Sequence, residues 1–71
     1  MQRKLYKELW LLRFQKMLDL EEGAIREYQE LLRQLKDDIK LKEKFETLIQ
    51  DETQHAKLIR QLIEIVHEQA D

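Results

Sequence analysis

The sequence predicts an all-α protein, in which a hairpin of two antiparallel helices pairs with a second copy to complete a four-helix bundle. Helix-breaking residues are almost absent, because the chain of 71 residues has no proline and one glycine. Apolar residues recur every three or four positions along two long segments, as expected of helices that bury one side. A single polar break, KDDIK at residues 36–40, separates these segments. We therefore expect one helical-hairpin domain over residues 1–71.

The first helix is expected over about residues 3–36. Its apolar residues form two rows with a spacing of seven, and a third row flanks them. The first row holds Leu11, Leu18, Ile25 and Leu32, the second holds Phe14, Glu21, Tyr28 and Leu35, and the flank holds Trp10, Met17, Ala24 and Leu31. Such a widened stripe is typical of a helix that packs in a bundle.

The second helix is expected over about residues 39–69, after a turn at residues 37–38. Asp37 or Asp38 can cap its first turn, because an aspartate side chain accepts hydrogen bonds from free backbone N–H groups. Here one row holds Phe45, Glu52, Ile59 and Val66, the other holds Leu41, Leu48, His55 and Leu62, and Ile49, Ala56 and Ile63 flank them. The stripe again predicts bundle packing.

Three polar side chains, Glu21, Glu52 and His55, interrupt these otherwise apolar rows. A buried carboxylate without a partner is very costly, so we expect these groups to be protonated, paired or bound to a metal. In an antiparallel hairpin that turns near residue 37, residues whose numbers add up to about 74 lie at the same height. Glu21 is then level with residue 53, and all three interruptions converge at one height.

Two copies of the hairpin would supply the ligand set of a di-iron bundle, which is one Glu from each of two helices and Glu-x-x-His from each of the other two. The spacing of three puts Glu52 and His55 on the same side of their helix, one turn apart. Mixed carboxylate and imidazole ligands suit iron, manganese or zinc. Calcium, which prefers oxygen ligands alone, is not expected.

Composition and charge exclude several functional classes. The formal net charge is −2 and charges of both signs are interleaved, so no clustered basic face for nucleic acid is expected. The absence of cysteine excludes disulfides and thiolate metal sites. No apolar run is long enough to span a membrane, and no signal peptide is recognisable, so we expect a cytoplasmic location.

Two stretches, LEEGAIREY and DETQH, resemble the ferritin-like superfamily, especially rubrerythrin-like and encapsulated-ferritin-like proteins. In those proteins one helix carries Glu-x6-Tyr and the next carries Glu-x-x-His. Glu21 and Tyr28 fit the first spacing, and Glu52 and His55 fit the second. The resemblance covers roughly residues 14–66. It implies a half-bundle that builds its site between subunits, and it leaves open a location inside a protein nanocompartment, with an encapsulating shell as a further partner.

The resemblance also implies roles for these residues. Glu21 would be a terminal iron ligand, Glu52 a bridging ligand and His55 a terminal nitrogen ligand, while Tyr28 would form a hydrogen bond near the site. Two iron ions would be held by each pair of chains. The implied activity is that of a ferroxidase, in which Glu21, Glu52 and His55 hold Fe(II) while dioxygen or peroxide oxidises it.

Two other functions stay open. The first is a non-enzymatic assembly module, in which Glu52 and His55 form a buried pair that fixes helix register. The second is a di-metal carrier or sensor without turnover. In every case we expect a homo-oligomer, because two helices alone leave wide apolar faces in water. Further apolar residues near the termini predict an assembly larger than a dimer. These residues are Leu5, Leu9, Leu12, Leu58 and Ile65.

Overall fold

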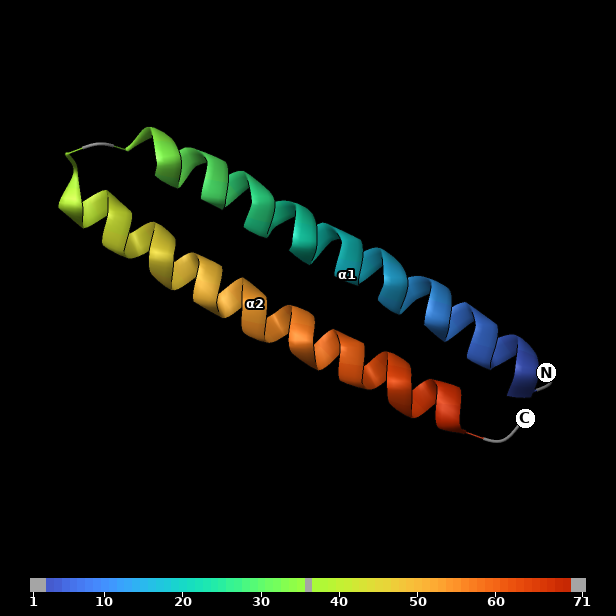
Figure 1. Cartoon of the computed structure of the whole chain (residues 1–71). Coiled ribbons are helices and arrows are strands. Elements are labelled where there is room, and N and C mark those ends of the chain that lie inside the picture. Colours follow the sequence, from blue (N-terminus) through green and yellow to red (C-terminus); the bar gives the residue numbers. More distant parts are fainter. Residues whose placement is uncertain (1–2, 36, 70–71) are drawn as a thin grey trace.

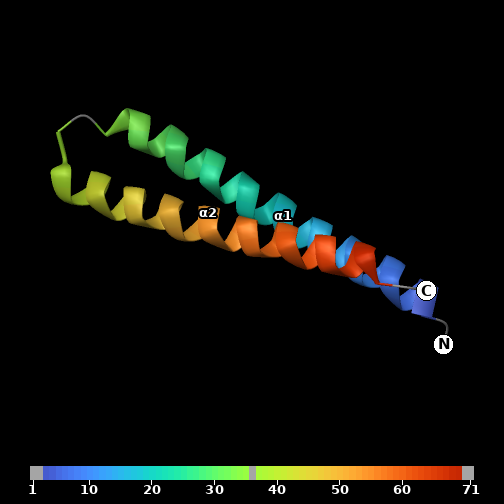
Figure 2. The same ribbon diagram turned by 60° about the horizontal axis from the view of Figure 1, so that its bottom comes forward.

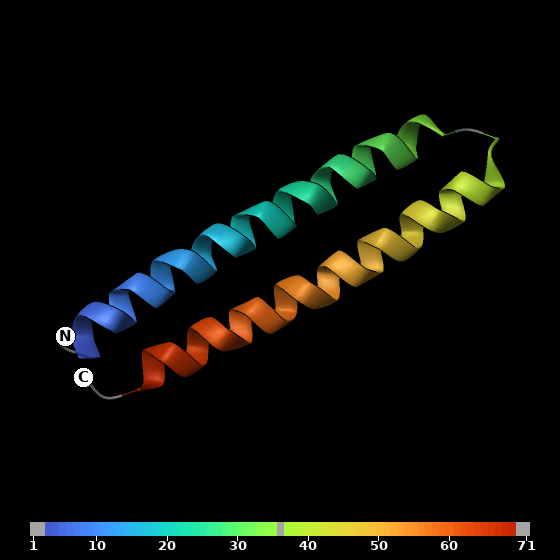
Figure 3. The same ribbon diagram turned by 180° about the vertical axis from the view of Figure 1, so that it is seen from behind.

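The computed structural model shows two long antiparallel helices joined by a short turn (Figure 1). It describes residues 3–35 and 37–69, and their side chains from Tyr6 onward. Helix α1 spans Arg3–Gln34 and helix α2 spans Ile39–Glu68. The first turn of α1 and the last turn of α2 lie at the same end, as the view from behind also shows (Figure 3). The all-α hairpin predicted from the sequence is therefore confirmed.

Local hydrogen bonds set the helix ends at the turn. The Asp38 side chain accepts a hydrogen bond of 3.0 Å from the backbone N–H of Leu41, so Asp38 is the N-cap of α2. The Leu35 N–H donates to the Leu32 carbonyl at 3.2 Å, which tightens the end of α1 and leaves Leu35 outside the helix. The expected helix end at residue 36 lies outside the described residues.

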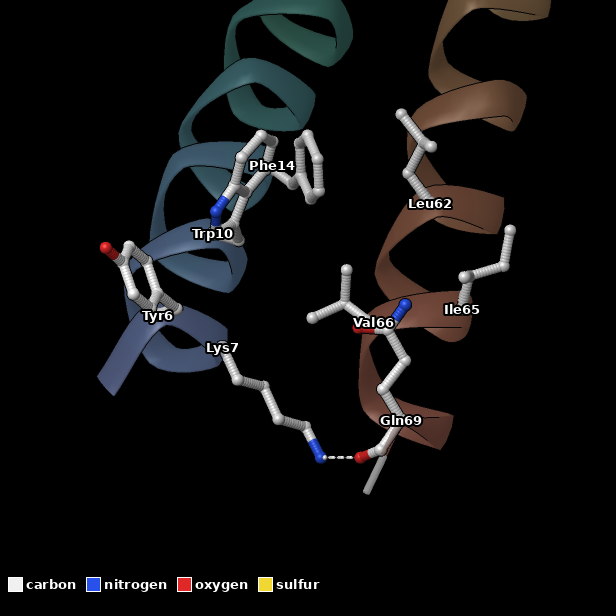
Figure 4. A pocket seen from close by; sticks show the side chains of 8 residues that line it. All are labelled: Tyr6, Lys7, Trp10, Phe14, Leu62, Ile65, Val66 and Gln69. Atoms are coloured by element: carbon white, nitrogen blue, oxygen red, sulfur yellow. Dashed lines mark hydrogen bonds between the residues drawn. The ribbon is translucent and has the colours of Figure 1, made fainter. Parts of the chain in front are cut away.

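The other end of the hairpin is held by Lys7. Its Nζ donates to the backbone carbonyls of His67, at 3.1 Å, and of Gln69, at 2.8 Å (Figure 4). A cation at this position complements the negative end of the α2 dipole. Helix α2 ends at Glu68, one residue before the expected end, where the Gln69 N–H caps it by donating to the Val66 carbonyl.

The core of one hairpin is small. Among the described residues only Leu18, Ala56 and Ile59 are buried, and Phe14, Ile25 and Ile63 pack against them. The accessible surface is 6012 Å². A compact monomer of this mass, 8.8 kDa, would expose about 4,800 Å². The hairpin thus leaves much of its apolar surface in water.

Neither of the described helices is long and apolar enough to cross a membrane.

Helix α1 places its rows as the sequence predicts, whereas helix α2 does not. On α1 the two expected rows face α2 and the flanking residues Trp10, Met17 and Leu31 are exposed. On α2 the order is reversed, because the flanking residues Ala56 and Ile63 face α1. The second expected row is exposed instead. Its described members are Leu41, Leu48, His55 and Leu62.

The exposed rows of the two helices lie on one side of the hairpin. On both helices they stand one residue before positions that face the other helix. In an antiparallel pair of right-handed helices, such positions fall on the same side. We call this side the open face and define it by one row from each helix. The rows are Trp10, Met17, Ala24 and Leu31 of α1, and Leu41, Leu48, His55 and Leu62 of α2.

A cavity of about 660 Å³ lies between the helices near the termini (Figure 4). Trp10 of α1 and Leu62 of α2 both line it, which agrees with their places on one side of the hairpin. The Trp10 and Phe14 rings lie in contact there, with centroids 5.4 Å apart. In the turned view of Figure 2, the start of α1 and the end of α2 again lie at the same end of the hairpin. The remaining lining residues are Tyr6, Lys7, Ile65, Val66 and Gln69.

Candidate metal centre

Glu21, Glu52 and His55 come together near the middle of the hairpin. Each offers one ligand atom, and the three atoms lie within 4.8 Å of one another. His55 Nδ1 is 4.0 Å from Glu21 Oε2 and 3.9 Å from Glu52 Oε1. Donor atoms around one transition-metal ion lie about 3 Å apart. The group would therefore have to close by about 1 to 2 Å to hold an ion, which side-chain rotations can provide.

Packing beside the site explains why the two helices bring these groups together. Ala56 follows His55 directly and is only 1% exposed, so its small side chain lets the helices approach closely. Leu18 of α1 is buried in the same cluster, three residues before Glu21. Glu52 and His55 share one side of α2 because they are separated by three residues.

An ion pair next to the site also connects the helices. Arg60 donates to the Glu22 carboxylate at 3.2 Å, from α2 to α1. Sequence reasoning missed this pair, because the two residues stand at different heights in an antiparallel hairpin. The long arginine side chain spans that offset. Nothing in the spacing of the sequence signals such a contact.

The Glu21 side chain is only partly exposed to water. Its Oε2 atom is buried and accepts no hydrogen bond within the part of the chain that the structure describes. The pKa of Glu21 is raised above 4.5, first because its protonated form can donate a hydrogen bond to Glu52. Burial and the negative charge of Glu52 raise this pKa further, and His55 lowers it. Within the described part of the chain, the basic group beside the ionised form of Glu21 is His55, whose Nδ1 lies 4.0 Å from Glu21 Oε2.

His55 is placed differently from the expectation that it lies in a buried row. Its side chain is 55% exposed, against 24% for Glu21 and 21% for Glu52. The reason is that its row forms the edge of the open face, which a single hairpin does not cover. The imidazole therefore borders both the carboxylate pair and the uncovered side of the molecule.

Tyr28 lies outside this group. It is half-buried, and its ring packs on Phe45 with the centroids 6.0 Å apart. Seven residues separate it from Glu21, which is about 10 Å along a helix. A hydrogen bond from Tyr28 near the site therefore stays a prediction, while its packing contact is observed.

The donor set fits a divalent transition metal. Two carboxylates and one imidazole suit iron, manganese or zinc. Two ionised carboxylates would balance the charge of one divalent ion, and the cation would supply the partner that Glu21 Oε2 lacks. The chemistry of these side chains therefore agrees with a metal site, although one hairpin contributes only three ligands.

Comparison with known proteins places the chain in a family. A family model described as Rubrerythrin matches residues 15–71, which is more than half of the chain. The chain belongs to the rubrerythrin family. The resemblance to the ferritin-like superfamily, to which this family belongs, is thereby confirmed. No curated protein and no solved structure gave a significant match.

Membership of the rubrerythrin family bears on the candidate site. The matched residues include Glu21, Tyr28, Glu52 and His55. The family generally binds iron and has a ferritin-like fold, which agrees with the donor set described above. The family match thus adds iron as a candidate ligand of the Glu21–Glu52–His55 group, which side-chain geometry alone would not single out.

Proposed function

We propose that two copies of this chain bind a pair of iron ions between them and oxidise Fe(II) with dioxygen or peroxide. The observation that carries this proposal is the convergence of Glu21, Glu52 and His55 at the edge of the open face. These three groups are half of the ligand set of a di-iron bundle. A second copy would supply the other half, so that four carboxylates and two imidazoles surround two divalent ions.

The open face supports this partnership. It carries exposed apolar side chains on both helices, above and below the level of His55. A second hairpin packed on it would bury these side chains and bring its own Glu21, Glu52 and His55 to the same height. Trp10 and Leu62 of this face line the cavity near the termini, so the partner's side chains would also reach it. The proposed product is an antiparallel four-helix bundle with twofold symmetry.

Each residue has a distinct proposed role. Glu52 would be the ligand shared between the two ions, and Glu21 and His55 would each hold one of them. The site would thus bring together two Fe(II) ions that one oxidant can oxidise. Two electrons leave the Fe(II) pair and reduce dioxygen, with two protons, to hydrogen peroxide, or hydrogen peroxide, with two protons, to two water molecules.

Oxidation kinetics test the proposal. Fe(II) is added anaerobically to the apo protein, oxygen is then admitted, and the near-ultraviolet absorbance of Fe(III) is followed. We expect faster oxidation than in buffer for the natural chain and loss of this rate enhancement in Glu52→Ala. Glu64→Ala is the matched control, because Glu64 is an exposed glutamate on the same helix outside the site.

The alternatives give different results. Tight Fe(II) binding without faster oxidation would mean a carrier or sensor. Absence of binding, together with a more stable protein when Glu21, Glu52 and His55 are replaced by Leu, would mean a pair that fixes helix register. Either result would contradict the proposed ferroxidase activity.

A further inference from the structure

Helix α1 carries apolar side chains on the side that faces away from α2. Leu9, Leu12 and Leu20 are exposed, and none of them belongs to the open face. Successive residues turn by about 100° around an α-helix, so these three lie well away from the buried Leu18. We call them the α1 outer patch. The Leu5 side chain, which the sequence grouped with them, lies outside the described residues.

Helix α2 has a corresponding patch on its own far side. Leu58 and Ile65 are exposed, and they stand two and nine residues after the buried Ala56. These separations turn them about half a circle away from α1, although Ile65 also borders the cavity near the termini. We call them the α2 outer patch. A second copy docked on the open face would leave most of both outer patches uncovered.

The two outer patches match in height and in charge. Leu9 and Ile65 stand level in the antiparallel hairpin, since Lys7 contacts the carbonyls of His67 and Gln69 just beyond them. Residues 3–18 contain five basic residues and one acidic residue. Residues 61–69 contain the acidic Glu64 and Glu68 and no lysine or arginine. Near the termini, the α1 outer patch is thus bordered mainly by positive charge and the α2 outer patch by negative charge, whereas Leu20 lies beside Asp19 and Leu58 lies beside Lys57.

We propose that the α1 outer patch of one chain binds the α2 outer patch of a neighbouring chain. Two hairpins side by side, turned in the same direction, bring the patches together at equal height with their helices antiparallel. Apolar contact supplies the attraction, and the opposite charges at the rim orient the encounter. The occupant of each patch is therefore another copy of this chain.

This contact differs from the one proposed at the open face. It joins two different surfaces, so repeated contacts close into a ring or extend as an open array, whereas a twofold contact stops at two chains. It uses none of the metal ligands. The inference therefore goes beyond the proposed di-iron function and does not depend on metal binding.

Sedimentation velocity of the apo protein at micromolar concentration tests the contact. We expect a mass greater than two chains, which falls to two chains or fewer in Leu12→Glu and decreases as salt is raised. Leu12→Glu adds a charge that repels the acidic rim of the α2 outer patch. Ile39→Glu is the matched control, because Ile39 is as exposed as Leu12, at 69%, and belongs to neither patch. A mass of two chains or fewer for the natural protein would overturn the proposal.

Disulfide trapping tests the pairing itself, because the chain has no cysteine of its own. Leu9→Cys and Ile65→Cys variants are mixed under oxidising conditions. We expect a cross-link between the two different variants and little within either one alone. Cross-linking within Leu9→Cys alone would show a symmetric contact and overturn the pairing of α1 with α2.

A metal-free control separates this inference from the proposed function. Replacing Glu21, Glu52 and His55 together by Ala should leave the mass of the assembly above two chains. Leu12→Glu should retain the iron content per chain of the natural protein. If the triple variant dissociates to two chains or fewer, the assembly depends on the metal site and the independent contact is wrong.

Discussion

Two carboxyl groups, those of Glu21 and Glu52, share a small volume at the middle of the hairpin. Neither has a lysine or arginine within ion-pair distance among the described residues. The nearest basic group is the imidazole of His55, at about 4 Å from both. Like charges held this close are unfavourable unless a proton or a cation lies between them. Two carboxylates placed in this way destabilise the folded apo protein and favour the binding of a cation.

The raised pKa of Glu21 predicts how the stability of the apo protein depends on pH. Between 4.5 and the raised value, the folded protein binds a proton that the unfolded chain has released. The free energy of unfolding must therefore fall as pH rises through this range. Thermal unfolding followed by circular dichroism, at fixed protein concentration from pH 4.5 to neutral, should show this fall. Glu21→Gln should remove that part of the pH dependence.

Glu27→Gln is the control, because Glu27 is an exposed glutamate on the same helix outside the candidate site. It should follow the natural protein across the range. A divalent cation should reverse the trend, since ionised carboxylates bind it and its affinity rises with pH. Parallel curves for the natural protein and Glu21→Gln would contradict the pairing of Glu21 with Glu52.

At the level of single residues, the site was predictable because polar residues stand where the helix pattern calls for apolar ones. Glu21, Glu52 and His55 stood out because each interrupts an apolar row, and the equal-height relation brought them together. The exposure of His55 was not predictable, because the apolar stripe of α2 is wide and does not reveal which of its sides faces α1. The Glu22–Arg60 pair was not predictable either, since the reach of a long side chain leaves no periodic signal.

At the level of elements, the two helices follow from composition and periodicity, and their ends follow from local hydrogen bonds. The sequence located the break at residues 36–40 but left Asp37 and Asp38 equivalent as caps. The structure distinguishes them, because Asp38 has an extended backbone and its side chain accepts the hydrogen bond from the Leu41 N–H that defines an N-cap. Residue type alone does not decide which of two adjacent aspartates makes this contact.

The N-cap assignment predicts unequal effects of two adjacent substitutions. Asp38→Ala should lower the free energy of unfolding by about 1 kcal/mol, because the first turn of α2 loses an acceptor. Asp37→Ala should change it by less than about 0.5 kcal/mol, as is usual for an exposed residue without such a contact. Urea denaturation of both variants and the natural protein measures the difference. Equal losses in the two variants would contradict the assignment.

At the level of the whole molecule, the hairpin is elongated and its interior is thin. The Cα atoms extend over 55 × 14 × 13 Å, and their radius of gyration is 16.4 Å. A compact domain of this length would have a radius of gyration of about 11 Å. With so few buried side chains, most of the apolar surface is available to other chains. The contacts proposed at the open face and at the outer patches would therefore supply much of the stability of the folded chain.

We propose that two chains share one site for two iron ions, and native mass spectrometry tests this sharing most directly. Apo protein is loaded anaerobically with Fe(II), excess iron is removed, and the bound metal is counted in each oligomer. We predict two iron ions for every two chains, none on single chains, and none in a variant with Glu52→Ala and His55→Ala. Iron retained by single chains, or by that variant, would contradict the shared site.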